Sequence, residues 1–175
     1  MLVASYNDGI EQSNPKFYNG VDMIRVNSAW FTDKELFNIL KCNDKPKFLD
    51  ININGRSKPI REEHGYKRLL MLASFFNVDW VGISNVEDTK IYVEIRKILG
   101  DSPIKICAKI ETELGCWNSS DILHKFDGVM VDVDDLAMDL GWKRSIEEKN
   151  RIYKECEETG KVYFRLAGVI FEKRY

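Results

Sequence analysis

The sequence predicts an α/β fold with a parallel sheet, because short apolar segments alternate along the chain with longer segments that carry apolar residues at helical spacing. Each apolar segment has the length of a buried strand and is too short for a helix. Parallel strands need crossover connections, and the amphipathic segments supply them as helices. About seven strand and helix units follow one another, which is typical of a TIM-type (β/α) barrel. We expect one barrel domain over residues 1–175, partial or irregularly closed.

The expected elements follow from turn residues and helix capping signals. Thr32 with Glu35 forms a capping box, Ser145 with Glu148 forms a second, and Gly160 is expected to end the last helix. The expected strands cover residues 2–6, 21–27, 47–51, 79–84, 104–111, 126–135 and 162–167, and the expected helices cover 32–40, 62–76, 88–99, a segment from 119, and 145–159.

The closure of the barrel stays open at this point, because a typical TIM-type barrel has eight units and about 250 residues. Either residues 167–171 and the C-terminus close the ring irregularly, or the barrel is open and a partner covers the gap. An open sheet edge is a liability for a protein. We therefore expect a homo-oligomer or a partner subunit.

Composition excludes several classes of partner. The net charge is −2 and the chain has no run of Lys or Arg, so we expect no nucleic acid and no anionic membrane surface. No apolar run approaches the roughly 18 residues of a membrane span, and the start of the chain has no secretory pattern. Cys42, Cys107, Cys116 and Cys156 form no CxxC pair, so we expect buried free thiols and a cytoplasmic location.

Charged residues gather at the ends of two neighbouring expected strands. Lys109 and Glu111 are two residues apart and therefore lie on one face of the first strand. Asp132, Asp134 and Asp135 crowd the end of the second. Sites in barrels and open parallel sheets lie at the carboxyl ends of strands, so these residues are candidates for a site. A solvated ion pair is the alternative for Lys109 and Glu111.

These two strands resemble pyruvate kinase. The matching segments are Lys109-Ile110-Glu111, Asp127-Gly128-Val129-Met130-Val131 and Asp135-Leu136. The resemblance implies that Lys109 stabilises an enolate or a transferred phosphoryl group, and that Glu111 and Asp135 hold Mg²⁺ or Mn²⁺. It implies a small-molecule ligand, namely phosphoenolpyruvate, pyruvate or a related 2-oxoacid.

A second similarity points to the same kind of ligand. Ile110-Glu111-Thr112 and residues 135–141 are similar to metal-dependent oxoacid aldolases and citryl-type lyases. The expected reaction is therefore either a reduced kinase-type transfer or a lyase-type cleavage, both of which proceed through enolpyruvate chemistry.

The second and third strands extend the resemblance to pyruvate kinase. It implies that Arg25 faces the phosphoryl group or carboxylate of the ligand and takes a catalytic role, and that Asn27 and Asp50 contribute to substrate binding. A structural salt bridge is the alternative for Arg25. Ala29 and Ile51 stand where the family has side-chain oxygens for a monovalent cation, so we expect no dedicated site for one.

The chain departs from the family pattern at three places. Asp134 stands where a glycine amide binds the substrate carboxylate, so it either repels an anionic substrate or serves as a third metal ligand. Ala167 stands where the family has a proton-delivering threonine. Residues 52–60 read as a short turn where the family has an inserted lid domain, so we expect no lid.

Three functions remain open from sequence. The first is an enzyme of enolpyruvate chemistry. The second is a catalytically inactive module that binds or regulates through the inherited site. The third is a structural subunit completed by a partner. Turnover would indicate the first, ligand binding without product the second, and poor stability of the isolated chain the third.

Overall fold

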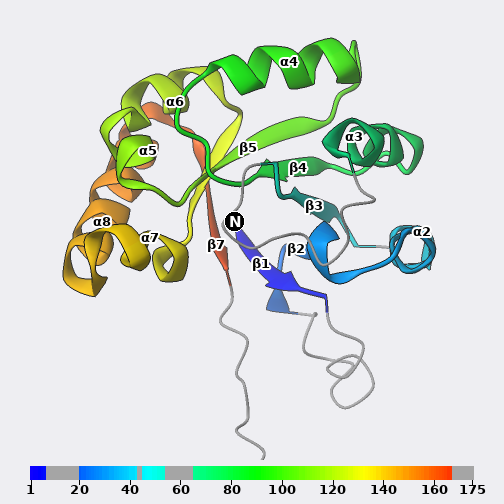
Figure 1. Cartoon of the computed structure of the whole chain (residues 1–175), viewed down its shortest axis with the longest axis horizontal. Coiled ribbons are helices and arrows are strands. Elements are labelled where there is room, and N and C mark those ends of the chain that lie inside the picture. Colours follow the sequence, from blue (N-terminus) through cyan, green and yellow to red (C-terminus); the bar gives the residue numbers. More distant parts are fainter. Residues whose placement is uncertain (7–19, 43–44, 54–64, 167–175) are drawn as a thin grey trace, which may run out of the picture.

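Seven parallel strands among the described residues form a closed barrel, in the order in which they occur along the chain (Figure 1). The computed structural model describes residues 1–6, 20–42, 45–53 and 65–166. The strands are β1 (Leu2–Ser5), β2 (Met23–Asn27), β3 (Lys47–Ile51), β4 (Trp80–Ile83), β5 (Lys105–Ile110), β6 (Gly128–Val131) and β7 (Val162–Leu166).

The ring closes where β7 pairs in parallel with β1. Leu2 lies opposite Arg165, and Val3 lies opposite Leu166. The predicted α/β barrel is therefore confirmed, and its open form is wrong. Residues 167–171, which we considered as an irregular closing segment, lie outside the described part of the chain, as does most of the expected turn at 52–60.

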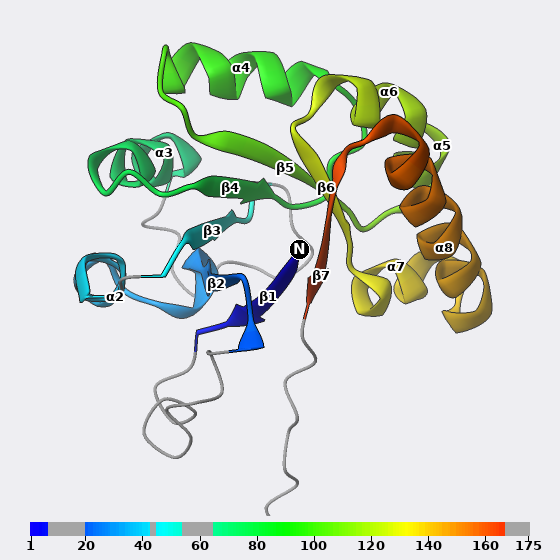
Figure 2. The same cartoon turned by 180° about the vertical axis from the view of Figure 1, so that it is seen from behind.

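Helices surround the barrel on the outside (Figures 1 and 2). A 3-10 turn, η2 (Ser28–Trp30), follows β2. The described α-helices are α2 (Asp33–Cys42), α3 (Tyr66–Phe75), α4 (Lys90–Leu99), α5 (Glu113–Trp117), α6 (Ser119–Lys125), α7 (Val133–Leu140) and α8 (Trp142–Thr159). No helix in the described ranges is both long enough and apolar enough to cross a membrane.

The sequence predicts capping boxes at the starts of two helices, and the structure has one of them. The box at α2 is present, because the Thr32 amide donates to Glu35 Oε2 at 2.7 Å and the Glu35 amide donates to Thr32 Oγ1 at 3.2 Å. The second expected box is wrong: α8 begins at Trp142, and the Ser145 hydroxyl inside it donates to the Gly141 carbonyl at 2.9 Å. Gly160 ends α8 in the left-handed conformation, at φ +66°, as expected.

Strand alternation divides the core into two clusters. The larger cluster lies between the outer face of the barrel and the helices. The smaller cluster fills the barrel interior with one residue from each strand, and the ring of Phe164 contacts Phe48 and Trp80 at centroid distances of 5.1 and 4.7 Å. Its members are Val3, Met23, Phe48, Trp80, Cys107, Met130 and Phe164.

Two glycines make room for these rings. A Cβ on Gly82 would overlap the ring of Phe48, and a Cβ on Gly128 would lie 2.9 Å from the ring of Trp80. The interior is therefore packed by placing an aromatic ring over a strand that lacks a side chain at that point.

We expect Gly82→Ala to lower the free energy of unfolding by about 1–3 kcal/mol, because the added methyl group would force the buried ring of Phe48 to move. Urea titration measures this change. Gly65→Ala is the matched control, since no heavy atom lies within 4 Å of a Cβ at that position. An unchanged unfolding midpoint in Gly82→Ala would contradict the close packing of the interior.

Candidate functional site

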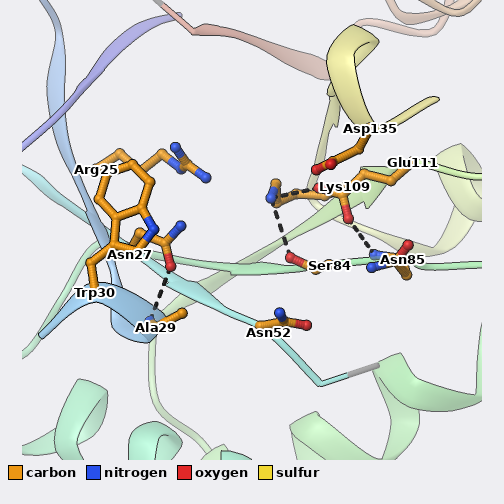
Figure 3. Close-up of a pocket in the computed structure, with 10 residues that line it drawn as sticks. All are labelled: Arg25, Asn27, Ala29, Trp30, Asn52, Ser84, Asn85, Lys109, Glu111 and Asp135. Carbon is orange, nitrogen blue, oxygen red and sulfur yellow. Dashed lines mark hydrogen bonds and ion pairs between the residues drawn. The ribbon is translucent and has the colours of Figure 1, made fainter. Parts of the chain in front are cut away.

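The polar residues of the site lie two residues further along the strands than the apolar residues that fill the barrel interior. Residues two apart on a strand face the same side, so Arg25, Asp50 and Lys109 follow Met23, Phe48 and Cys107 into the interior. They lie toward the carboxyl ends of the strands. A cavity of about 70 Å³ opens above them. Its lining is shown in Figure 3 and comprises Arg25, Asn27, Ala29, Trp30, Asn52, Ser84, Asn85, Lys109, Glu111 and Asp135.

The Asp50 carboxylate joins both buried cations of the site. It accepts hydrogen bonds from Arg25 Nε at 2.7 Å and from Arg25 Nη2, and Lys109 Nζ lies 3.1 Å from its Oδ2. The Ser84 hydroxyl donates to Oδ1 at 3.4 Å. Burial alone would raise the pKa of Asp50, but Arg25 and Lys109 hold it below its ordinary value. Asp50 is therefore an anion between two cations.

Lys109 is a fixed cation in this network. Its ammonium lies 2.6 Å from Glu111 Oε1 and donates to Ser84 Oγ at 3.2 Å. Burial opposes the charge, but the Asp50 and Glu111 carboxylates raise the pKa of Lys109 to about 12. The Lys109 and Glu111 side chains are only 4% and 1% exposed, so this ion pair is buried rather than solvated.

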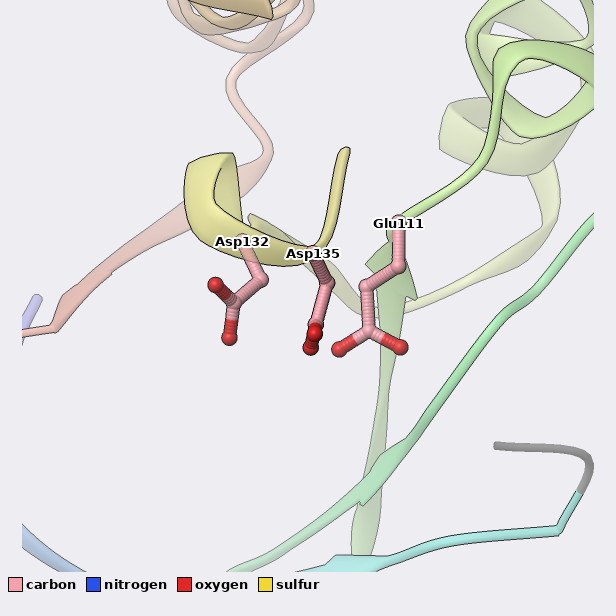
Figure 4. A group of neighbouring side chains, drawn as sticks. All are labelled: Glu111, Asp132 and Asp135. Atoms are coloured by element: carbon pink, nitrogen blue, oxygen red, sulfur yellow. The ribbon is translucent and has the colours of Figure 1, made fainter. Parts of the chain in front are cut away.

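Three carboxylates meet at the mouth of the barrel (Figure 4). One of them, Glu111, contacts the Lys109 ammonium. One oxygen from each of Glu111, Asp132 and Asp135 lies within 4.8 Å of the others. Glu111 follows β5, whereas Asp135 lies in the first turn of α7, where negative charge is favourable. The backbone amide of Asn85 donates to Glu111 Oε2 at 2.8 Å. Asn85 has a left-handed backbone conformation, with φ +52°.

The charge state of this cluster suits a divalent cation. Burial raises the pKa of Glu111 to about 7 despite its contact with Lys109. Burial and the neighbouring Asp132 raise the pKa of Asp135. In both groups burial is the largest cause, because it disfavours the charged form of the carboxyl group, and a bound cation would offset that cost. Clustered carboxylate oxygens are the ligands that Mg²⁺ and Mn²⁺ prefer, so Glu111, Asp132 and Asp135 fit such an ion.

The structure brings most of the candidate residues from the sequence together. Five of them line the cavity, and Asp50 is buried among them. Arg25, Asn27, Lys109, Glu111 and Asp135 line the cavity. Asp50 is buried within the interior network that Arg25 and Lys109 form. Asn27 Oδ1 accepts a hydrogen bond from the Ala29 amide at 3.0 Å, which caps η2.

Asp134 lies elsewhere. Its exposed side chain lines a second cavity, of about 400 Å³, together with Lys149 and Arg165. The expected strand 126–135 ends at Val131, so Asp134 and Asp135 belong to a helix and point in different directions.

Sequence reasoning did not assign roles to three residues of the site, namely Asp132, Ser84 and Asn85. Asp132 follows the inward-facing Met130 by two residues, and Ser84 follows Gly82 in the same way. Strand alternation could have placed both in the interior. The role of the Asn85 amide depends on its positive φ, for which the sequence has no clear signal.

The closed parallel barrel, with charged side chains at its carboxyl mouth, defines an α/β barrel protein of the TIM type. Residues 58–167 match the family model of the pyruvate kinase barrel domain. The chain belongs to the pyruvate kinase family.

Two relatives show how far the similarity extends. Pyruvate kinase from Clostridium perfringens is 31% identical over 96 residues, which is 53% of this chain and 20% of that protein. Pyruvate kinase from Dictyostelium discoideum is 33% identical over 87 residues, which is 49% of this chain and 17% of that protein. The matched part of the chain therefore spans about a fifth of the length of these relatives.

We expect Asp50→Asn to lower the free energy of unfolding by about 3–5 kcal/mol near neutral pH, because it leaves the buried Arg25 and Lys109 without their shared counter-charge. Since the pKa of Asp50 is lower in the folded protein than its ordinary value of 3.8, the unfolded state takes up a proton first on acidification. The stabilisation from Asp50 is therefore complete above that value and is lost as the pH falls below it.

Urea titrations between about pH 6 and pH 3 measure both effects. The acid-dependent loss of stability should be shallower in Asp50→Asn than in the wild type. Asp127→Asn is the control, because Asp127 pairs with Arg96 at 2.8 Å outside the site, and these side chains are 32% and 27% exposed. Equal acid dependence in Asp50→Asn and the wild type would contradict the central role of Asp50.

Proposed function

We propose that this protein binds pyruvate, phosphoenolpyruvate or a related 2-oxoacid at a divalent-metal site and catalyses enolpyruvate chemistry. The observation that supports this most directly is the meeting of Glu111, Asp132 and Asp135 beside the buried Lys109 ammonium. Membership of the pyruvate kinase family supports the same ligand class.

The three carboxylates would hold Mg²⁺ or Mn²⁺, which supplies Lewis-acid stabilisation of negative charge on the oxygens of the ligand. Lys109 presents a permanent positive charge next to that position. Asn27, Ser84 and Asn85 line the cavity and offer hydrogen bonds that orient a small polar ligand. The barrel excludes water from below, because the apolar layer lies directly under this network.

The charge of Lys109 favours some reactions over others. An amine that attacks a carbonyl group must be neutral, and a pKa of about 12 keeps Lys109 protonated at neutral pH. We therefore propose electrostatic stabilisation by Lys109 and not a covalent imine. This role fits both a reduced kinase-type transfer and a metal-dependent lyase-type cleavage, and it leaves a catalytically inactive binding module as the alternative.

We propose a cytoplasmic location, in keeping with relatives from Solanum tuberosum and Nicotiana tabacum that are named cytosolic isozymes. A second copy of the chain or a partner subunit also stays a proposal. The pairing of β7 with β1 removes the open sheet edge that first suggested one.

We expect the purified protein to bind Mn²⁺, and the metal-loaded protein to bind oxalate, which mimics the enolate of pyruvate. Glu111→Gln and Asp132→Asn should each weaken Mn²⁺ binding at least tenfold, because loss of a group that only supports a metal ligand already costs about 10–100-fold. Titration calorimetry measures both steps.

Glu113→Gln is the matched control for these variants, because Glu113 is two residues from Glu111 but pairs with Arg144 at 2.9 Å outside the cluster. Asp134→Asn tests the role that the sequence suggested for Asp134. Absence of Mn²⁺ binding in the wild type, or unchanged binding in both Glu111→Gln and Asp132→Asn, would contradict the proposed metal site.

We expect the protein with Mg²⁺ to accelerate the exchange of pyruvate methyl protons for deuterium, because exchange requires enolisation. Proton NMR in deuterated water follows this reaction. Lys109→Met should lower the exchange rate about 100-fold or more, as expected for loss of one preorganised electrostatic contact. Oxalate binding without exchange in the wild type would instead favour the inactive binding module.

A further inference from the structure

We propose that a second copy of this chain docks on the side of α8 that faces β7, and that the Trp142 side chain of each copy enters a cavity of the other. This contact does not depend on the proposed oxoacid chemistry.

An exposed stripe of side chains runs along one side of α8. Trp142, Ile146 and Lys149 are four and three residues apart, so they share a face of the helix. Trp142 is 62% exposed, and Ile146 is 48% exposed. The helix therefore presents a large aromatic side chain to solvent next to an aliphatic one, and tryptophan is among the commonest anchors of protein interfaces.

The stripe leads to the cavity of about 400 Å³ that Asp134 lines. Lys149 belongs to both, because its side chain also lines the cavity. Leu2 of β1 and Leu166 of β7 line it as well and are 36% and 38% exposed. Figure 2 shows β7 with β1 on one side and α8 on the other. The cavity therefore opens to solvent where β1, β7 and α8 come together.

The chemistry of the cavity suits an indole ring. Lys149 and Arg165 supply positive charge for the π face of a tryptophan. Arg165 already makes a contact of this kind, since its guanidinium lies 4.7 Å from the centre of the Tyr153 ring. A buried tryptophan also needs an acceptor for its indole N–H, and the Asp134 carboxylate offers one.

The spacing along α8 fits a two-fold contact. Trp142 and Lys149 are seven residues apart, which is about 10 Å along the helix axis, and Ile146 lies near the middle. If two copies pack α8 against α8 in antiparallel orientation about Ile146, each Trp142 lies opposite Lys149 of the other copy and enters its cavity. Both copies then use the same surface, so the contact closes as a dimer.

The area of this contact indicates the strength of the dimer. An aromatic side chain buries about 150–250 Å², so the exposed part of Trp142 corresponds to roughly 100–150 Å². With its own tryptophan and its own cavity, each copy would bury roughly 200–300 Å². A specific interface needs at least about 500 Å² per copy, so Ile146 and the side chains around it must supply the remainder. We therefore expect a reversible dimer with a micromolar dissociation constant.

Sedimentation velocity of the wild-type protein between about 1 and 500 µM tests for this dimer. We expect the average mass to rise from that of one chain toward that of two. Trp142→Ala should raise the dissociation constant at least about tenfold, as expected for loss of a tryptophan anchor. A wild-type protein that stays monomeric over the whole range overturns the proposal, and so does an unchanged dissociation constant in Trp142→Ala.

Trp117→Ala is the matched control, because Trp117 is 68% exposed but lies in α5. Arg144 pairs with Glu113 of α5 at 2.9 Å, and it follows Trp142 by two residues, which is slightly more than half a turn. The α5 helix therefore packs on the opposite side of α8. Trp117→Ala should leave the dissociation constant unchanged. A dimer that is lost in Trp117→Ala but kept in Trp142→Ala would use another face and would overturn the proposal.

A mixture of two variants tests the fit of tryptophan and cavity directly. Leu166→Arg places a long charged side chain at the cavity and should weaken self-association at least about tenfold. Mixed with Trp142→Ala, it should form a heterodimer that is tighter than either homodimer, because its intact Trp142 enters the intact cavity of the other variant. A mixture without such a heterodimer overturns the proposal. If Leu166→Arg does not fold, the wild type and Trp142→Ala still decide.

Discussion

The contact of Asp50 with Arg25 and Lys109 is the interaction on which the rest of the site depends. Two cations buried side by side in a barrel would repel each other and lose their hydration, and both costs are large in the interior. One carboxylate between them satisfies both. Together with Glu111 it keeps Lys109 charged, and it holds the Arg25 guanidinium in the interior.

The position of this contact follows from the way the barrel is filled. Each strand contributes one apolar residue to a lower layer, and the next inward-facing residues along the strands form the polar network. Large rings in the lower layer fit because Gly82 and Gly128 leave space for them. The same alternation that seals the lower part of the barrel therefore presents charged side chains at its carboxyl end, where the cavity lies.

Local patterns in the sequence were sufficient to predict the strands, the barrel class and the position of Lys109 and Glu111 on one face of a strand. They were insufficient where the outcome depends on residues far apart or on a boundary of one or two positions. The sequence could not decide closure, because β1 and β7 meet only in three dimensions. At the end of β6, an expected strand through residue 135 would place Asp132 and Asp134 on one face. The strand stops at Val131, and the turn into α7 brings Asp135 to the cavity while Asp134 faces outward.

The pairing of β1 with β7 determines when the barrel can close during synthesis on the ribosome. It joins strands from opposite ends of the described chain through two residue pairs, whereas β2 and β3 pair through four. A nascent chain that has not yet released β7 cannot complete the ring, so it holds an incomplete sheet with an unpaired edge and its interior aromatic residues uncovered. Premature termination within α8 would thus yield an aggregation-prone fragment, not a smaller barrel.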